Sequence, residues 1–424
     1  MRRRSLLGLC VGLRVGLSVG LLAAAGAAAA QPRELVMWRH DTGDAEMVAS
    51  AGAVERFNAQ QQRWRVRVET LPQGSYQQAV VASALAGRLP CVLTLDQPTV
   101  PNFAWAGHIR ALEGPLRPAG VDALIPGGRS GYAGKLYAVG QFDVALALFA
   151  RRSVLQRHGI RLATMDRPYA AEEFRSILRT LKAAGWRYPL DMHADRGDEW
   201  PSYKYSPWWQ SAGADLIDRR TYRRADGVIN SPAAVAVGRY FASLFTERLV
   251  SRKPIDDHVF TSGRAVFQYS GSFDMAEYRR FVGDDLVVLP PPDFGRGPRI
   301  GAGSWQWAIS TTCAEPEGAR AFLEHLITVD EIADFSRRTA LMPTLAAAAD
   351  RTELYRQGGE GRPFFEFARA WAVLRPETPA YPVISSAFAK AMQDIRDGGD
   401  VAESLDRAAD TIHADLERNH GYGH

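Results

Sequence analysis

The chain has 424 residues and a formal net charge of +4. Its first 30 residues contain four arginines and no acidic residue, so the remainder, from Gln31 onward, is formally neutral. A neutral chain lacks the basic stripe that phosphate contacts require, which argues against binding to nucleic acid. The remainder is longer than one hydrophobic core usually holds, so we expect two lobes.

Residues 1–30 have the pattern of an export signal. Arg2 opens a run of three arginines, residues 6–25 are apolar and small, and Ala30 ends an alanine run that offers a cleavage site. Arg14 interrupts the apolar stretch, which disfavours a retained membrane-spanning helix. We expect cleavage near Ala30 and a soluble protein in the periplasm. The paired arginines also fit a twin-arginine signal, so the export route stays open.

Strands and helices alternate at the start of the mature chain. Strands are expected at Glu34–Trp38, Trp64–Glu69 and Pro90–Asp96, with helical segments ending near Phe57 and Leu85 between them. This alternation predicts a parallel sheet built from βα units.

The middle of the chain continues the mixture. Strands are expected at Gly134–Val139 and Val144–Phe149, and apolar residues within 174–181 recur at helical spacing. Ser206 followed by Pro207 favours the start of a further helix, with two tryptophans in its first turn.

Two later segments combine glycine, serine and aromatic residues. Gly263–Phe273 and Gly301–Ser310 each contain a short apolar strand beside a Gly/Ser turn. Glycine lets backbone approach a ligand closely, and an aromatic ring offers a flat apolar face. A sugar needs both, although core strands with turn glycines would show the same pattern. Helices are expected at Pro316–Leu326 and near the C-terminus.

Several short motifs, in this order, carry a family resemblance. Residues 134–139 read GKLYAV where the family has GKLYGVP, 271–273 read GSF for GSW, and 400–405 read DVAESL for TVDEAL. The chain thereby resembles the extracellular solute-binding proteins of family 1, the maltose-binding type of substrate-binding subunit in carbohydrate ABC importers. Gly140 departs from the family's proline, and the tryptophan of TWDEF is absent near Phe174.

The resemblance implies an α/β fold of two lobes joined by a hinge, with a ligand cleft between them. It implies a signal peptide over 1–30, an N-terminal lobe over 31–143 plus 300–345, and a C-terminal lobe over 144–299 plus 346–424. It also implies a monomer that closes around a ligand and docks on membrane permease subunits, with no cofactor, no metal and no catalytic residue.

Candidate cleft residues follow strand ends, open helices or stand at family positions. Asp143 stands where the family carries a sugar-binding carboxylate, and Phe273 takes the place of a stacking tryptophan. Each candidate has a plainer alternative as a cap, turn or core residue. The full set is Trp38, His40, Asp41, Asp96, Gln97, Gln141, Asp143, Tyr203, Trp208, Trp209, Ser272, Phe273, Ser304, Trp305 and Arg338.

Cys91 and Cys313 are the two cysteines outside the signal. Cysteines in an oxidising compartment can pair, but two buried thiols are an open alternative. In the fold that the resemblance implies, the strands carrying them can lie adjacent and antiparallel, so a disulfide between them is a hypothesis.

The sequence favours a binding function over an enzymatic one. Sugar recognition with aromatic stacking is the first hypothesis, with at least two sugar units suggested by the number of aromatic residues. The same fold could instead bind glycerol phosphate, which would favour Arg39 and Arg338, or a polyamine, which would favour Asp96 and Asp143. An exported glycosidase would need two carboxylates across a bond, but the chain lacks nucleophile-elbow, zinc and phosphate-loop motifs.

Overall fold

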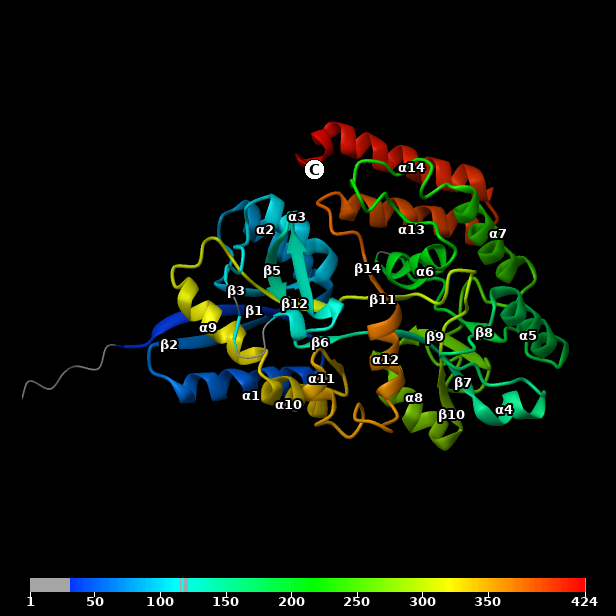
Figure 1. Cartoon of the computed structure of the whole chain (residues 1–424), viewed down its shortest axis with the longest axis horizontal. Helices are drawn as coiled ribbons and strands as arrows, with labels where there is room; N and C mark the ends of the chain where they lie inside the picture. The colour runs from blue at the N-terminus through cyan, green and yellow to red at the C-terminus, as the bar shows by residue number, and fades with distance from the viewer. Residues whose placement is uncertain (1–30, 115, 118–120, 198, 424) are drawn as a thin grey trace, which may run out of the picture.

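The computed structural model describes residues 31–114, 116–117, 121–197 and 199–423, so the expected signal peptide lies outside the described residues. Two β-sheets, each covered by helices, form two lobes that lie side by side (Figure 1). The two-lobe α/β fold expected from the sequence is confirmed. Among the described residues no helix is both long enough and apolar enough to cross a membrane.

The N-terminal lobe contains a six-stranded sheet. Its strands β1, β2 and β3 are parallel, and β12 returns antiparallel to β3. Because this sheet is covered on both faces, its middle strands are apolar almost throughout. In spatial order the strands are β2 (Trp64–Leu71), β1 (Arg33–His40), β3 (Val92–Asp96), β12 (Trp305–Ile309), β5 (Lys135–Val139) and β4 (Arg129–Tyr132).

Helices pack on both faces of this sheet. On β12, Trp307 and Ile309 belong to one core cluster and the intervening Ala308 to another, as the two-residue period of a strand requires. Helix α1 buries Ala49, Ala53 and Phe57, one turn apart, toward the sheet. The helices are α1 (Asp44–Gln60), α2 (Gln73–Leu85), α3 (Val100–Trp105), α9 (Pro316–Leu326) and α10 (Val329–Thr339).

The C-terminal lobe is built on a four-stranded sheet. Residues Leu146–Ala150 of its strand β7 are all without exposed surface, because β7 lies inside the sheet and helices cover both faces. In spatial order the strands are β10 (Leu286–Leu289), β7 (Leu146–Arg151), β9 (Phe267–Gly271) and β8 (Leu190–Asp191).

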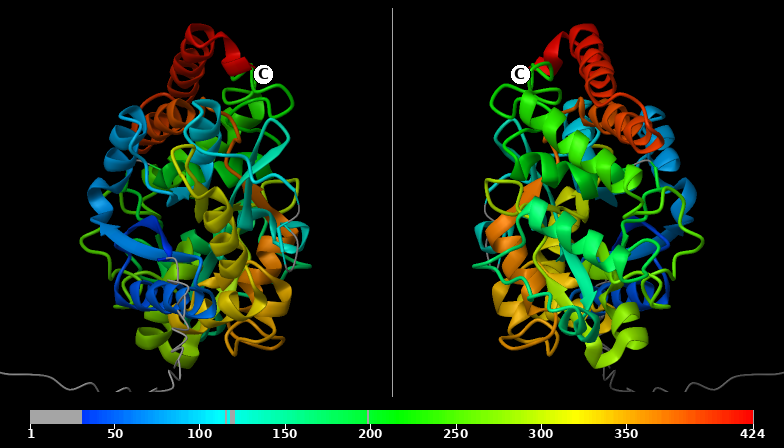
Figure 2. Two further views of the ribbon diagram at one scale, coloured as in Figure 1. Left: turned by 90° about the vertical axis from the view of Figure 1, so that its left-hand side faces the viewer. Right: turned by 90° about the vertical axis from the view of Figure 1, so that its right-hand side faces the viewer.

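Helices of the C-terminal lobe come from the middle and the end of the chain. Helices α13 and α14 pack on each other along one side of the molecule, and the chain ends above α3 of the other lobe (Figures 1 and 2). The helices are α4 (Arg152–Arg157), α5 (Ala171–Ala183), α6 (Trp200–Ser211), α7 (Pro232–Thr246), α8 (Met275–Val282), α12 (Arg362–Trp371), α13 (Tyr381–Asp397) and α14 (Val401–Arg418). The four-residue α11 (Ala346–Ala349) lies between α10 and these C-terminal helices in the chain.

Short strand pairs link the lobes. Strand β6 (Phe142–Asp143) pairs with β13 (Met342–Pro343), and β11 (Ile300–Ala302) pairs with β14 (Ala372–Leu374). Strand β6 leads into β7, and β11 leads into β12, so the chain passes between the sheets at these points. The exact lobe boundaries stay a prediction.

Helix α6 differs from the sequence prediction. It begins at Trp200, and Pro207 lies inside it instead of at its first position. Because proline has no N–H, the carbonyl of Tyr203 receives no helical hydrogen bond from residue 207. Gly301 of β11 packs there, since a Cβ on it would lie 2.3 Å from that oxygen. Tertiary packing therefore stabilises a helix that local capping rules would divide.

Cys91 and Cys313 form a disulfide in the structure, with Cα atoms 4.3 Å apart. The pairing agrees with the hypothesis from the sequence. Strands β3 and β12 are antiparallel neighbours, so the residue before β3 and the residues after β12 meet at the same end of the sheet.

Candidate ligand-binding site

A groove of about 760 Å³ lies between the lobes, within the size range of small-molecule sites. The start of α2 and the segment after β3 form one wall, and the start of α6 with α13 forms the other. Its lining side chains are Gln73, Gln77, Gln78, Asp96, Thr99, Glu199, Tyr381, Pro382, Ser385, Ser386, Ala389, Lys390 and Gln393, together with Gly74.

Neutral polar groups dominate this lining. Four glutamine amides, three Ser/Thr hydroxyls and the Tyr381 hydroxyl line the groove, against two carboxylates and Lys390. Lys390 is exposed and forms an ion pair with Asp394 of its own helix. Amides and hydroxyls each donate and accept hydrogen bonds, which is the complement that a polyhydroxylated molecule needs.

The two carboxylates belong to opposite walls and meet one buried arginine. Both oxygens of Asp96 accept from Arg375, at 3.0 and 3.2 Å, and Glu199 Oε1 accepts from the same guanidinium at 2.8 Å. Tyr381 and Ser385 also donate to Glu199. Burial raises the pKa of Glu199, against the opposing effect of the Arg375 charge. These carboxylates are therefore occupied by protein partners.

Behind Arg375 lies a buried polar cluster, which consists of Gln97, Asp143, Tyr203, Gly303 and Arg375. The Gly303 carbonyl accepts from Arg375 Nη2 at 3.0 Å, and the Gly303 N–H donates to Asp143 Oδ1 at 2.8 Å. Burial raises the pKa of Asp143 to about 6, opposed by the Val144 and Gly303 amides that donate to it. Both Gln97 amide atoms, Asp143 Oδ2, Tyr203 Oη and Arg375 Nε are buried without a hydrogen-bond partner.

Such unpaired groups are costly in a folded interior, and several in one cluster indicate a place where a ligand or water would supply the missing bonds. Of the predicted residues, the structure thus places Asp96 on the groove, and Gln97, Asp143 and Tyr203 in the cluster that touches its inner end.

Further predicted residues lie on the N-terminal lobe, around a pair of aromatic rings in contact. The His40 and Trp305 rings contact each other with centroids 3.7 Å apart and planes tilted by 32°. Burial lowers the pKa of His40 to about 4, helped by the Arg39 charge. Together with Gln141 they line a void of about 10 Å³, which has room for about one water. A sugar ring would not fit in this void as the structure stands.

The remaining polar candidates have local backbone roles. Asp41 is exposed and accepts from the Gly43 N–H, Ser272 accepts from the Ala145 N–H, and the Ser304 carbonyl accepts from the Gln97 N–H. The Trp38 indole donates to Glu69 on β2, which is the edge strand of the sheet.

Phe273 is the aromatic candidate with an open face. Its side chain is 37% exposed at the end of β9, and its ring lies 6.1 Å from that of Trp200. The guanidinium of Arg196 covers the other ring, 4.9 Å from the Trp200 centroid. Phe273 therefore remains available as a stacking platform.

Trp208, Trp209 and Arg338 were predicted to line the ligand cleft, but the structure places all three away from the groove. Both indoles are completely buried in the core of the C-terminal lobe, where Trp208 stacks on Phe294 and Trp209 packs edge-on against Phe388. Neither ring has a surface to offer a ligand in this structure. Arg338 lies on α10, is half exposed and pairs with Asp334 of the same helix, away from the groove.

Sequence reasoning missed Arg375, Glu199, Tyr381 and the glutamines of α2. The signal at Glu199 was present, because it directly precedes the Trp200-Pro201 helix start. Arg375 had no comparable signal: it precedes Pro376 in a segment without periodicity.

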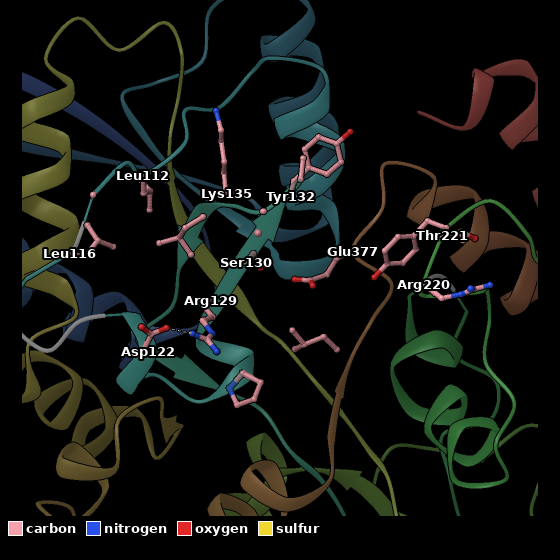
Figure 3. A pocket seen from close by; sticks show the side chains of 18 of the residues that line it. Leu112, Leu116, Asp122, Arg129, Ser130, Tyr132, Lys135, Arg220, Thr221 and Glu377 are labelled. Carbon is pink, nitrogen blue, oxygen red and sulfur yellow. Dashed lines mark hydrogen bonds and ion pairs between the residues drawn. The ribbon is translucent and has the colours of Figure 1, made fainter. Parts of the chain in front are cut away.

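A second groove of about 1240 Å³ lies beside β4 and β5, facing the loop that contains Arg220 (Figure 3). Arg129 points toward Asp122 and pairs with it, whereas the Lys135 and Arg220 side chains extend in different directions. The cations of this groove therefore do not converge on a common point.

Two α/β lobes with a polar groove between them, at the carboxyl end of β3, have the architecture of a solute-binding class of protein. The sequence profile described as bacterial extracellular solute-binding protein matches residues 52–359, and the chain belongs to this family. The resemblance inferred from the sequence is thereby confirmed.

Solved structures agree with this fold. The cyclic α-maltosyl-1,6-maltose binding protein from Arthrobacter globiformis superposes with a TM-score of 0.77 at 22% identity, covering 91% of this chain and 100% of that one. The sugar-binding protein MalE from Xanthomonas citri gives 0.78 at 16% identity, covering 91% and 98%. MalE from Bdellovibrio bacteriovorus, bound to maltotriose, gives 0.71 at 16% identity, covering 91% and 100%.

Proposed function

We infer that this protein is the periplasmic substrate-binding subunit of an ABC importer and binds a neutral sugar or oligosaccharide in the groove between its lobes. The observation that carries this proposal is the lining of the groove by amides and hydroxyls, with both carboxylates already paired to Arg375. Solved structures with this fold bind maltose-type oligosaccharides, which supports the same ligand class.

The buried polar cluster extends this site inward. A sugar hydroxyl can donate to Asp143 Oδ2 and accept from the Gln97 amide or the Tyr203 hydroxyl, all of which lack partners. Phe273 would contribute the apolar platform for a ring face. Trp208 and Trp209 are fully buried and contribute no platform, so the number of aromatic residues does not indicate how many sugar units bind.

The charges of the site disfavour the alternative ligands. A glycerol phosphate would need a free cation, but Arg39 hydrogen bonds to Thr42 and to the carbonyl of Glu46, and Arg338 lies elsewhere. A polyamine would need several free carboxylates. Those of Asp96 and Glu199 are engaged, and Asp143 offers a single unpaired oxygen, Oδ2. We propose binding without turnover, followed by docking of the closed monomer on membrane permease subunits.

The test is a binding screen on protein that begins at Gln31. Mono-, di- and oligosaccharides, glycerol phosphate and spermidine are each tested by thermal shift, and each hit is measured by calorimetry. A ligand at 100 times its dissociation constant stabilises by about 2.7 kcal/mol, which is readily visible. We expect a saccharide to be the strongest hit, with no released product on prolonged incubation.

Matched variants locate the site. Replacing Gln73 and Gln77 by alanine should weaken saccharide binding, because both amides line the groove. Gln156→Ala on α4 is the control, since Gln156 is exposed and distant from the groove lining. A response to glycerol phosphate or spermidine alone would keep the fold and overturn the ligand class.

A further inference from the structure

Two adjoining hollows lie on the C-terminal lobe, outside the groove between the lobes. One measures about 690 Å³ and the other about 520 Å³, and both are lined by Tyr188, Ser251 and Lys253, so they form one continuous depression. Its lining comes from the segments 184–191 and 245–264, which carry β8 and lead into β9. Neither hollow shares a lining residue with the groove between the lobes. We call this depression the cationic groove.

Positive side chains dominate its lining. Four exposed cations of the lining form no ion pair with any described residue, and they are Arg187, Arg248, Arg252 and Lys253. A fifth, Arg264, is bound by Asp256 at 2.5 Å. Because the chain from Gln31 onward is formally neutral, these cations are a local concentration of charge and do not reflect a basic protein.

Acidic side chains close to this groove are already paired with other arginines. Asp257 binds Arg196 at 3.0 Å. Both oxygens of Asp397 accept from Arg396, at 2.8 and 2.9 Å, and Arg252 lies near this pair without being part of it. The four unpaired cations therefore remain available to an anionic partner.

Aromatic and aliphatic side chains lie among these cations. Tyr188 lines both hollows, with the Arg187 guanidinium 5.4 Å from its ring centroid. A hydrogen bond from Arg248 lowers the pKa of Tyr188, and the Arg187 charge lowers it further, so both cations converge on this phenol. Trp186 is half-buried in the wall, and Ile255 is 80% exposed although it is aliphatic. An exposed apolar residue beside unpaired cations is typical of an interaction site.

One buried acceptor lies in the lining of the groove. Asp191 is only 4% exposed and is the one carboxylate among the described lining residues of the two hollows. Its Oδ1 accepts from the His193 N–H at 3.0 Å, whereas Oδ2 is buried without a hydrogen-bond partner. Burial raises the pKa of Asp191, and the buried Lys204 opposes that rise, so a cation of the core faces this carboxylate. Oδ2 can accept from an N–H of a bound molecule.

These features favour an extended chain over other anions. A single small anion needs cations that surround one point, whereas these cations line two hollows on either side of Tyr188. A bilayer surface contacts protruding groups and does not reach Asp191, which is nearly inaccessible. A peptide supplies all three complements, namely carboxylates for the cations, apolar side chains for the walls and a backbone N–H for Asp191.

We propose that the cationic groove is a docking site for an acidic segment of another protein, in which carboxylates alternate with apolar side chains. The site shares no residue with the groove between the lobes, so the proposal does not depend on which solute that groove binds.

Fluorescence anisotropy with a defined probe tests this. The probe is a fluorescein-labelled peptide that alternates glutamate and leucine, and the matched peptide has glutamine in place of each glutamate. We expect protein from Gln31 to bind the acidic peptide at least about tenfold more tightly, and this binding to weaken with added NaCl because the cations are exposed. Equal affinity for the two peptides, or no binding of the acidic one, overturns the proposal.

Charge-reversal variants locate the binding. Arg187→Glu with Lys253→Glu should lower the affinity for the acidic peptide about tenfold or more. The control is Arg152→Glu with Arg157→Glu, which reverses two exposed cations of α4 that lie outside both hollows, and it should bind like wild type. If the first double variant does not fold, Lys253→Gln replaces it, and a smaller loss is expected. Unchanged affinity in the folded variant contradicts the assignment.

Two further measurements separate other occupants and other sites. Phosphatidylglycerol vesicles that bind wild type when the acidic peptide does not would overturn the proposal and assign the cations to a membrane surface. Any saccharide that binds the groove between the lobes should leave the peptide bound, because the two sites have no residue in common. Displacement of the peptide by that saccharide would place both in one site and also overturn the proposal.

Discussion

The backbone N–H of Gly303 donates to the carboxylate of Asp143 at 2.8 Å, although 160 residues separate them in the chain. Asp143 ends the strand that leads into β7, and Gly303 precedes β12, so one carboxylate ties two connections between the sheets. Oδ1 also accepts from the Val144 N–H, which leaves Oδ2 as the buried oxygen without a hydrogen-bond partner. Asp143 thus joins two connections between the sheets through hydrogen bonds to backbone N–H groups.

The raised pKa of Asp143 predicts a pH-dependent stability. Its folded pKa of about 6 exceeds the reference value of 3.8, so the folded state binds more protons than the unfolded state between these values. The contribution of Asp143 to the free energy of unfolding therefore falls as pH rises from about 4 to 6, by roughly 1–3 kcal/mol.

Urea unfolding at pH 4 and pH 7 tests this expectation. Asp143→Asn should gain on wild type as the pH rises, because the amide does not ionise. The exposed Asp195→Asn controls for the loss of one carboxylate, and should follow wild type. An equal offset between wild type and Asp143→Asn at both pH values would contradict the assignment of a raised pKa.

Position 303 is predicted to tolerate no residue larger than glycine. Its φ of +92° lies in the region that favours glycine, and a Cβ would lie 2.6 Å from the Gln97 side chain. Gly303→Ala should combine backbone strain with this clash and lower the free energy of unfolding by about 2–4 kcal/mol. Gly134→Ala is the matched control, because its φ is +74° but nothing lies within 4 Å of the added Cβ.

Chemical denaturation of both variants gives the comparison. Gly134→Ala should lose only about 1–2 kcal/mol, the cost of a left-handed non-glycine residue. Equal losses in the two variants would show that backbone strain alone limits the position, and that contact with Gln97 is unimportant.

The disulfide predicts a large loss on removal. Cys91 and Cys313 are 222 residues apart, so their bond restricts much of the unfolded chain. The double replacement by serine should lower the free energy of unfolding by about 2–5 kcal/mol. Reduced wild type should show the same loss, and a thiol count on denatured, non-reduced protein from Gln31 should be zero. Two titratable thiols would mean that the bond does not form.

Much of the fold was readable in the sequence because the signals are local. The expected strand at Glu34–Trp38 lies within β1, Pro90–Asp96 overlaps β3, and the helix expected at Pro316–Leu326 coincides with α9. Apolar periodicity and proline at a helix start depend on neighbouring residues, so no knowledge of tertiary contacts is needed.

The site was only partly readable, since its key contacts join distant segments. Asp96 was found because a residue after a parallel strand lies at the ligand edge of the sheet. Its partner Arg375 is 279 residues away, with nothing local to mark it. The prediction that the tryptophans of α6 line the cleft was wrong for a related reason. A helix packed on nearly all sides shows the same polar and aromatic mixture as an exposed binding loop.

The contrast between Trp208 and Phe273 gives a last prediction. Trp208 is completely buried, stacked on Phe294 and beside Tyr269, so Trp208→Ala should leave a cavity and cost about 3–5 kcal/mol of folding free energy. Phe273 is 37% exposed and folds over Gly271, so Phe273→Ala should cost less than about 2 kcal/mol. Chemical denaturation measures both values.

For ligand affinity we expect the opposite order, with Phe273→Ala causing the larger loss and Trp208→Ala the smaller one. If Phe273 is the stacking platform, Phe273→Ala weakens saccharide binding by about 5- to 100-fold, the equivalent of about 1–3 kcal/mol of lost ring contact. Phe273→Tyr should retain most of the affinity because it keeps the flat face, and calorimetry on the folded variants makes the comparison. Unchanged affinity in Phe273→Ala would remove the aromatic platform from the site and leave recognition to the amides and hydroxyls of the groove.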